Sequence, residues 1–311
     1  SQVGPGAVVT GVCLVVLSNV FFSWGESLIA AFLPELARPH ALGRVSGWGW
    51  GLGYLGGMLA LGLCLLVVIR AQSAGQSAAE FVPLTMWITA SVFAVASLFT
   101  FFGLKERAVS SPQSSAGRDG WHGAWLRLKA TYQKARHYQD FMWLMACAVA
   151  YQGGVAVTIA LAAIYAEQVI GFAQQETMVL IFVLNVAAAL GALAFGHWQD
   201  RIGHQRALGF TLIGWVLTCV IAALTTTKTG FWYAAAIAGV CMGSSQSSGR
   251  ALAGLFAPPG QLAEFFGLWT FATRLASIIG PLTYGVITWV TGGNHRLAIG
   301  STAVLFLIGW V

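Results

Sequence analysis

Charged residues are scarce in this sequence. Of its 311 residues, only 8% are Asp, Glu, Lys or Arg, whereas 57% are hydrophobic. A soluble domain carries roughly 25% charged residues, so this chain has too few to cover the surface of a water-soluble globule. The composition therefore excludes a typical cytosolic enzyme, a disordered protein and a nucleic-acid-binding protein. It indicates an integral membrane protein in contact with the lipid bilayer.

Groups that form disulfides or bind metals are also few and scattered. The five cysteines lie in separate apolar runs, at Cys13, Cys64, Cys147, Cys219 and Cys241. Because no two are close in sequence, we expect small core residues rather than disulfides. The six histidines lack ligand spacing, and no ATP-binding motif is present. We therefore expect no metal and no cofactor, and any driving force must come from a gradient.

Long apolar runs are what the sequence has instead. A membrane helix needs about 20 mostly apolar residues, and nine segments come near this: 6–33, 47–69, 82–104, 141–166, 177–197, 206–225, 231–256, 265–290 and 297–311. They do not alternate as outer-membrane strands do, and the first is too long for a signal peptide. The sequence predicts an all-α polytopic membrane protein. Because spans begin and end close to Ser1 and Val311, we expect a piece of a longer protein.

Basic residues are unevenly shared between the two sets of connecting loops. One set, which begins after the first span, holds eleven: Arg38, Arg44, Lys105, Arg107, Arg118, Arg127, Lys129, Lys134, Arg136, Arg201 and Arg206. The other set holds three, Arg70, Lys228 and Arg296. By the positive-inside rule the first set is cytoplasmic, so the first span enters from outside.

One long polar segment, 105–140, divides the chain into three spans (1–104) and six spans (141–311). Within it Trp121, Trp125, Leu128 and Tyr132 fall at helical spacing, with basic residues mostly off that face. This pattern predicts an amphipathic helix on the inner membrane surface. A solvated linker is the alternative.

A loop motif stands between the fifth and sixth spans: Gly196-His-Trp-Gln-Asp200-Arg201-Ile-Gly203-His-Gln-Arg206. Gly203 allows a tight turn, and Asp200 can accept hydrogen bonds from the N-terminus of a neighbouring helix. Arg201 and Arg206 keep the loop on the cytoplasmic side of the membrane. The motif resembles the signature of the major facilitator superfamily, although two of its basic positions are His204 and Gln205 here.

Further stretches, chiefly 43–57 and 264–267, resemble the vacuole-effluxer-like (autophagy-related permease) family, in its bacterial form. The resemblance implies a solute transporter that works by alternating access, with fungal relatives that export amino acids from vacuoles. It also implies that the nine spans are helices four to twelve of the fold, that 105–140 joins its halves, and that the membrane is the bacterial inner membrane. One departure is Tyr151-Gln152-Gly153-Gly154, where the family often carries an acid.

Three ionisable residues lie inside spans: Glu26, Arg250 and Arg274. Each costs several kcal/mol there unless it is paired or wetted. Arg274 lies the deepest of the three in its span. We expect it either to bind the solute or take part in gating, or to form an ion pair between two helices. For Arg250 we expect snorkelling or a pair with Asp200 or Glu264. Glu26 couples to protons or neutralises an arginine of another helix, and the second is favoured. Two arginines against one glutamate hint at a carboxylate-bearing solute.

Uncharged polar residues could complete a site at the middle of the membrane. The candidates are Asn19, Gln152, Asn185, Ser244, Ser245 and Gln246, with the serines around Gln246 as the preferred wall, and Tyr151, Tyr165 and Trp269 as aromatic surface. Hydrogen bonding between helices is the alternative for each. Close helix packing is predicted at two sets of small residues. One is formed by the glycines at 49, 53 and 57, with 47 and 51 alongside, and the other is the run 280–285.

The sequence thus predicts a secondary transporter of a small solute, first an amino acid or related carboxylate, with a proton as a possible coupling ion. We expect a monomer. Two other classes compete with this reading. A membrane-embedded enzyme would need clustered His, Asp or Glu at one depth, and no His lies deep in a span. A non-transporting scaffold or sensor that keeps the fold is supported by the lost acid beside Gln152.

Overall fold

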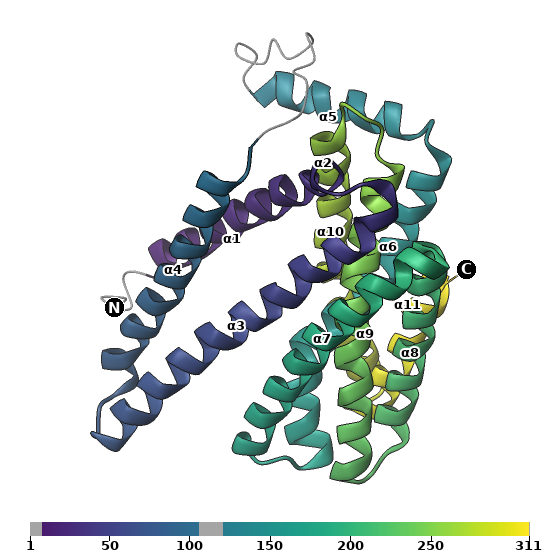
Figure 1. Ribbon diagram of the computed structural model, residues 1–311. Coiled ribbons are helices and arrows are strands. Elements are labelled where there is room, and N and C mark those ends of the chain that lie inside the picture. Colours follow the sequence, from purple (N-terminus) through teal and green to yellow (C-terminus); the bar gives the residue numbers. More distant parts are fainter. Residues whose placement is uncertain (1–7, 106–120, 311) are drawn as a thin grey trace.

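The computed structural model describes residues 8–105 and 121–310, and its regular elements are all helices (Figure 1). Each predicted span corresponds to one long helix, with bounds that differ by a few residues. These are α1 (Val8–Ala31), α3 (Leu42–Ser73), α4 (Ala78–Gly103), α6 (Gln139–Tyr165), α7 (Gln174–Ile202), α8 (His204–Leu224), α9 (Lys228–Phe256), α10 (Leu262–Val290) and α11 (His295–Trp310). The other helices are α2 (Leu33–Leu36), η2 (Pro39–Ala41), α5 (Trp121–Ala135) and η3 (Ala166–Ile170).

Seven stretches of the described chain are long and apolar enough to cross a membrane: Val8–Leu36, Pro39–Ser73, Ala78–Gly103, Gln139–Ile170, Gln174–Ile202, His204–Leu224 and Leu262–Val290. The α11 helix is apolar but shorter, at 16 residues. The α9 helix has 29 residues, but its glycines, serines and Arg250 lower its hydropathy. Most of its polar residues are buried against other helices, so α9 can be polar without exposing polar groups to lipid.

The helices form two groups, which we call the N-terminal helices (α1, α3 and α4) and the C-terminal bundle (α6 to α11). In the bundle α9 packs against α7 and α8, and α11 packs against α6 and α8. Its core includes Trp215, whose ring stacks on Phe306 with centroids 5.0 Å apart. The N-terminal helices meet the bundle through α3, which contacts α7 and α9, and through α1, which contacts α10. Beyond those contacts α3 and α4 diverge from the bundle toward the bottom of Figure 1.

Glycines set the closest helix crossings. A Cβ at Gly280 of α10 would overlap the backbone of Gly153 in α6, so the prediction of close packing at 280–285 is confirmed at Gly280. On α3 the close approach is made by Gly47 and Gly51, which face Ala192, Leu193 and Gly196 of α7. Along the predicted Gly49–Gly53–Gly57 face, a Cβ at Gly49 would lie 3.3 Å from Arg250 Nη2, whereas a Cβ at Gly53 or Gly57 would meet no other described helix within 4 Å. The register of α3 turns that face away from α7.

The polar segment does contain a helix, α5, which precedes α6. Thr131 Oγ1 donates a hydrogen bond of 3.0 Å to Glu264 of α10, and Ala135 is fully buried beside Phe265. The C-terminal part of α5 is therefore docked on the bundle. Tyr132 is exposed, whereas the side chains of Trp121, Trp125 and Leu128 lie outside the described residues.

Candidate functional site

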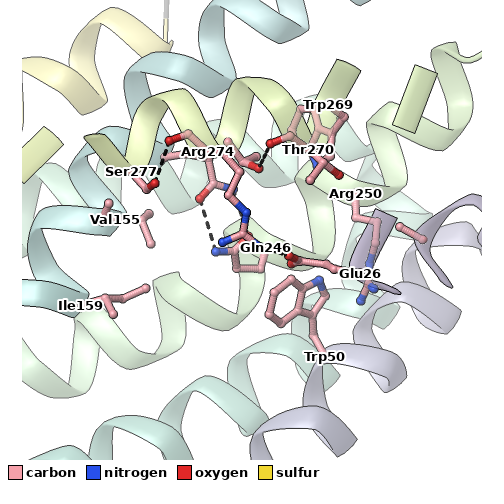
Figure 2. A pocket seen from close by; sticks show the side chains of 14 residues that line it. Glu26, Trp50, Val155, Ile159, Gln246, Arg250, Trp269, Thr270, Arg274 and Ser277 are labelled. Atoms are coloured by element: carbon pink, nitrogen blue, oxygen red, sulfur yellow. Dashed lines mark hydrogen bonds and ion pairs between the residues drawn. The ribbon is translucent and has the colours of Figure 1, made fainter. Parts of the chain in front are cut away.

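A cavity of about 160 Å³ lies between the two groups of helices (Figure 2). Its walls come from α1, α3, α6, α9 and α10, so residues far apart in sequence meet there. The polar and aromatic lining residues are Glu26, Trp50, Gln152, Gln246, Arg250, Trp269, Thr270, Thr273, Arg274 and Ser277. Five of the nine ionisable and polar residues predicted for the site therefore share one cavity: Glu26, Gln152, Gln246, Arg250 and Arg274.

An ion pair joins the two groups across this cavity. Arg274 Nη2 of α10 lies 2.5 Å from Glu26 Oε2 of α1, and Figure 2 shows the two side chains pointing toward one another. Both side chains are partly exposed, at 43% and 39%. The favoured interpretation, that Glu26 neutralises an arginine of another helix, is confirmed. The pair connects the N-terminal helices to the C-terminal bundle and gives each charge the partner that a charge inside a membrane needs.

Arg250 has different surroundings. Its guanidinium lies over the ring of Trp50 at 5.0 Å, and its Nε donates to Ser46 Oγ at 3.4 Å. The expected pairs with Asp200 or Glu264 are wrong, because Asp200 accepts from the α3 backbone and Glu264 accepts from Thr131. Arg250 therefore extends from the C-terminal bundle onto α3, where an aromatic face and a hydroxyl receive it.

Gln152 of α6 and Gln246 of α9 form a reciprocal amide pair. Gln152 Nε2 donates to Gln246 Oε1 at 2.9 Å, and Gln246 Nε2 donates back at 3.3 Å. The pair fixes the orientation of two amides that line the cavity, so each presents a defined edge. Nearby, Thr270, Thr273, Arg274 and Ser277 of α10 stand at i, i+3, i+4 and i+7, the spacing of one helical face.

The other four predicted residues lie outside the cavity, including Ser245, which donates to the Met242 carbonyl. Asn19 and Asn185 each donate to the carbonyl four residues earlier in the same helix, Val15 and Ile181. Ser244 is fully buried and donates to Val240 and Cys241. Of the aromatic candidates, Trp269 lines the cavity, while Tyr151 and Tyr165 are buried in the bundle.

The loop motif has the geometry that its residues predict. Gly203 has φ of +94°, a conformation that suits glycine and ends α7 sharply. Asp200 accepts hydrogen bonds from the backbone N–H groups of Gly43 and Arg44, at 2.8 and 3.0 Å. It therefore caps the N-terminus of α3, where negative charge is favoured. Gly196 packs against α3, since a Cβ there would lie 3.0 Å from Gly47 Cα.

Around this cap, uncharged hydrogen bonds join α3 to the bundle. Ser46 Oγ donates to the carbonyl of Ser247 at 2.9 Å, and Gln199 Nε2 donates to Ser247 Oγ at 3.0 Å. Sequence reasoning did not identify Ser46, Gln199 or the lining residue Trp50. For the α10 wall a signal was present, because its hydroxyls share a helical face with Arg274.

Comparison with known proteins places this chain in one family. Residues 3–311 match the family model described as "Vacuole effluxer Atg22 like". The chain is 25% identical over 299 residues to the uncharacterized MFS-type transporter YxiO of Bacillus subtilis, covering 95% of this chain and 68% of that protein. It is 23% identical to autophagy-related protein 22-1 of Emericella nidulans, but spans only 45% of that protein's length.

Solved structures share the fold at low sequence identity. FucP in its outward conformation superposes with a TM-score of 0.68 at 15% identity, over 92% of this chain and 70% of that one. The human organic anion transporter MFSD10 gives a TM-score of 0.67 at 16% identity, over 91% and 66%. Identities this low show the fold alone. Family match, fold and loop motif agree: the chain is an integral membrane protein that belongs to the Atg22-like vacuole effluxer family of the major facilitator superfamily, a family of transporters and not of enzymes.

Proposed function

We propose that this protein is a secondary active transporter that moves a small carboxylate-bearing solute by rocking two helical halves about the cavity. The observation that carries the proposal is the Glu26–Arg274 ion pair, which joins the N-terminal helices to the C-terminal bundle inside a polar cavity. Secondary transporters bind their solutes near the membrane midplane, at the interface between structural repeats. Arg274 and Glu26, which pair across the interface between the two groups of helices, could each bind a solute in place of the other.

The arrangement of α3 supports an outward-facing state. Its described contacts with the bundle lie in its N-terminal half, from Gly43 to Tyr54, and Asp200 caps that end. The basic loops Arg38–Arg44 and Arg201–Arg206 flank the same end, which the positive-inside rule assigns to the cytoplasm. Helices that meet there and diverge at the other end leave the cavity open toward the outside.

The nine long helices are proposed to span the membrane as helices four to twelve of the twelve-helix fold. The chain spans 66% to 70% of the solved transporters named above, which supports that count. Residues 1–104 then belong to the N-terminal half, 105–140 to the cytoplasmic connection with α5, and 141–311 to the C-terminal half. We also propose that the protein is a monomer, and, because the Bacillus relative is bacterial, that it lies in a bacterial plasma membrane.

An amino acid or related carboxylate is the proposed solute, and a proton is the proposed coupling ion. The arginines of the cavity suit a carboxylate, because guanidinium groups bind carboxylates with two parallel hydrogen bonds. FucP, which shares the fold, is described as a fucose:proton symporter. In the cavity of this chain, Glu26 is the carboxylate available to carry a proton among the described lining residues.

Efflux from preloaded proteoliposomes tests the proposal. The full-length protein is reconstituted with a panel of amino acids and simple carboxylates, with and without a pH gradient. We expect saturable efflux of one class that the gradient accelerates. Glu26→Gln should abolish the acceleration, because the amide cannot take up a proton. Flux of no solute with a correctly folded protein would refute transport and favour a scaffold or sensor.

A further inference from the structure

We propose that Arg250 and Trp50 form an inner gate: their contact closes the cytoplasmic side of the cavity and has to separate before the cavity opens inward. The inference rests on the proposed function, because a gate presupposes that the cavity opens alternately to the two sides. It concerns a contact between α9 and α3, both of which the structure describes over their whole length. The position of the contact, the fit of the guanidinium and the strength of the contact support it.

The contact lies between the cavity and the cytoplasmic end of the protein. Arg250 stands six residues before the end of α9, and Trp50 eight residues after the start of α3, which is about 9 and 12 Å from the cytoplasmic ends at 1.5 Å per residue. Arg274 stands twelve residues into α10, about 18 Å from that side. Arg250 and Trp50 both line the cavity, so they belong to the cytoplasmic part of its wall.

Three successive contacts join α3 to the bundle between the loop motif and the cavity. Asp200 caps the start of α3, Ser46 then donates to the Ser247 carbonyl, and the Arg250–Trp50 contact follows. Only the last of these three borders the cavity. A solute in the cavity therefore meets the inner gate before it meets the other two contacts.

The guanidinium of Arg250 is seated closely on α3. Its central carbon lies 5.0 Å from the centre of the Trp50 ring, and its Nε donates to Ser46 Oγ at 3.4 Å (Figure 2). A Cβ at Gly49 would lie 3.3 Å from its Nη2, so the glycine leaves the room that the group occupies. The ring of Tyr54, one turn further along α3, lies 5.8 Å from that of Trp50 and extends the aromatic surface.

The contact has a strength that a transport cycle can overcome. The ring and the hydroxyl that receive Arg250 carry no net charge. Glu26 interacts with Arg250 electrostatically, but the hydrogen bond of this carboxylate goes to Arg274. A cation over an aromatic ring shifts an equilibrium by about two- to thirtyfold. The inner gate therefore favours the closed state without locking it.

Labelling of a cysteine in the cavity tests the gate. The full-length protein carries Thr273→Cys in place of its native cysteines, and a membrane-impermeant maleimide is applied to right-side-out and inside-out vesicles without solute. Arg250→Met removes the cation, and Trp50→Leu removes the ring. We expect each to raise the labelling rate from the cytoplasmic side by about two- to thirtyfold. The rate from outside should fall, because the two openings exclude one another.

A double variant shows whether the two side chains act through one contact. Arg250→Met combined with Trp50→Leu should label no faster from the cytoplasmic side than the faster of the two single variants, since both changes remove the same contact. Arg296→Met is the matched control for the loss of a cation, because Arg296 binds the Ala223 carbonyl outside the cavity. It should leave both rates unchanged.

Two glycines of α3 give a second, independent test. Gly49→Ala crowds the guanidinium of Arg250 and should raise the labelling rate from the cytoplasmic side. Gly53→Ala, one turn further along the same helix, places its methyl group where no other described helix lies within 4 Å. It should leave the rate unchanged, so equal effects of the two changes would contradict the inner gate.

The remaining outcomes separate the inference from the proposed function. Unchanged labelling from the cytoplasmic side in Arg250→Met and Trp50→Leu would overturn the inner gate, and so would equal rises from both sides or additive effects in the double variant. Efflux that persists beside any of these results would leave transport intact. A shift of labelling from outside to inside in a protein that moves no solute would refute the transport proposal and leave the gate.

Discussion

The first turns of α3 and the cavity join the same two groups of helices by opposite means. At α3, Gly47 approaches the α7 backbone, and uncharged hydrogen bonds run from Ser46 and Gln199 to Ser247. In the cavity, a partly exposed ion pair and a cation on an aromatic ring make the connection. Small residues and uncharged hydrogen bonds give a close contact, whereas partly exposed charges can exchange their partners for water or solute.

This difference assigns a task to each region. The α3 contact is suited to holding one end of the protein closed, because it is stable without any ligand. The cavity is suited to sensing a solute, because a carboxylate alters its charge balance. A transporter that rocks about its centre needs both properties, and the following changes separate them.

Gly47→Val should have the largest effect. Its Cβ would overlap the carbonyl of Ala192 and approach Gly196 Cα, so α3 cannot close on α7. Overpacking of this kind costs about 1–3 kcal/mol of stability, and we expect most efflux to be lost. Thermal unfolding in detergent and proteoliposome efflux measure the two quantities.

Gly53→Val is the matched control for that change. No described atom lies within 4 Å of a Cβ at Gly53, so its unfolding temperature and efflux should stay near those of the unmodified protein. Equal losses in both variants would show that α3 tolerates no side chain anywhere, and the contact would have no special role.

Asp200→Asn should have an intermediate effect. The amide keeps one acceptor oxygen but loses the charge that faces two N–H groups at the start of α3. Charge-assisted hydrogen bonds contribute about 1.5–3 kcal/mol, so we expect a loss of part of that amount and slower efflux. Asp140→Asn, which removes a first-turn acid of α6, should lower the unfolding temperature less. The account of the loop motif fails if the order is reversed.

Lys228→Ala should have the smallest effect. Lys228 lies 2.6 Å from Glu176, both side chains are partly exposed, at 46% and 41%, and the pair lies outside the cavity. Exposed ion pairs contribute about 0–1 kcal/mol. Unfolding curves and efflux should therefore hardly change, unlike those of the cavity and α3 variants. A large loss would show that this pair, at the far ends of α7 and α9, also controls opening.

The helices could be predicted from the sequence because apolar runs of membrane length are a local signal. Each predicted span corresponds to one long helix, even though α9 has a low hydropathy for a membrane span. The cap at Asp200 was also predictable, since the motif fixes the turn at Gly203 and a carboxylate beside it. The close-packed glycine face of α3 could not be predicted. Gly47 and Gly49 look alike in the local sequence, and only the packing of α3 decides which neighbour each of them meets.

The cavity was predictable in part. Glu26 and Arg274 stand out as charges inside spans, and they pair as the favoured interpretation held. The neighbours of Arg250 depend on how α3 crosses α9, which no local pattern encodes, so Ser46 and Trp50 were missed. In the sequence, Asn19, Asn185 and Ser244 look like the residues that do line the cavity. In the structure, each of their side chains donates its hydrogen bond within its own helix.

Labelling of a cysteine at Thr273 tests the central claim, that the cavity opens alternately to the two sides of the membrane. Thr273 lines the cavity on α10 beside Arg274, and the native cysteines are first replaced by serine or alanine. A membrane-impermeant maleimide is applied from the outside or from the inside, with and without the transported solute. The account predicts reaction from outside in the resting protein and a solute-dependent gain of reaction from inside. Reaction from a single side under every condition would contradict it.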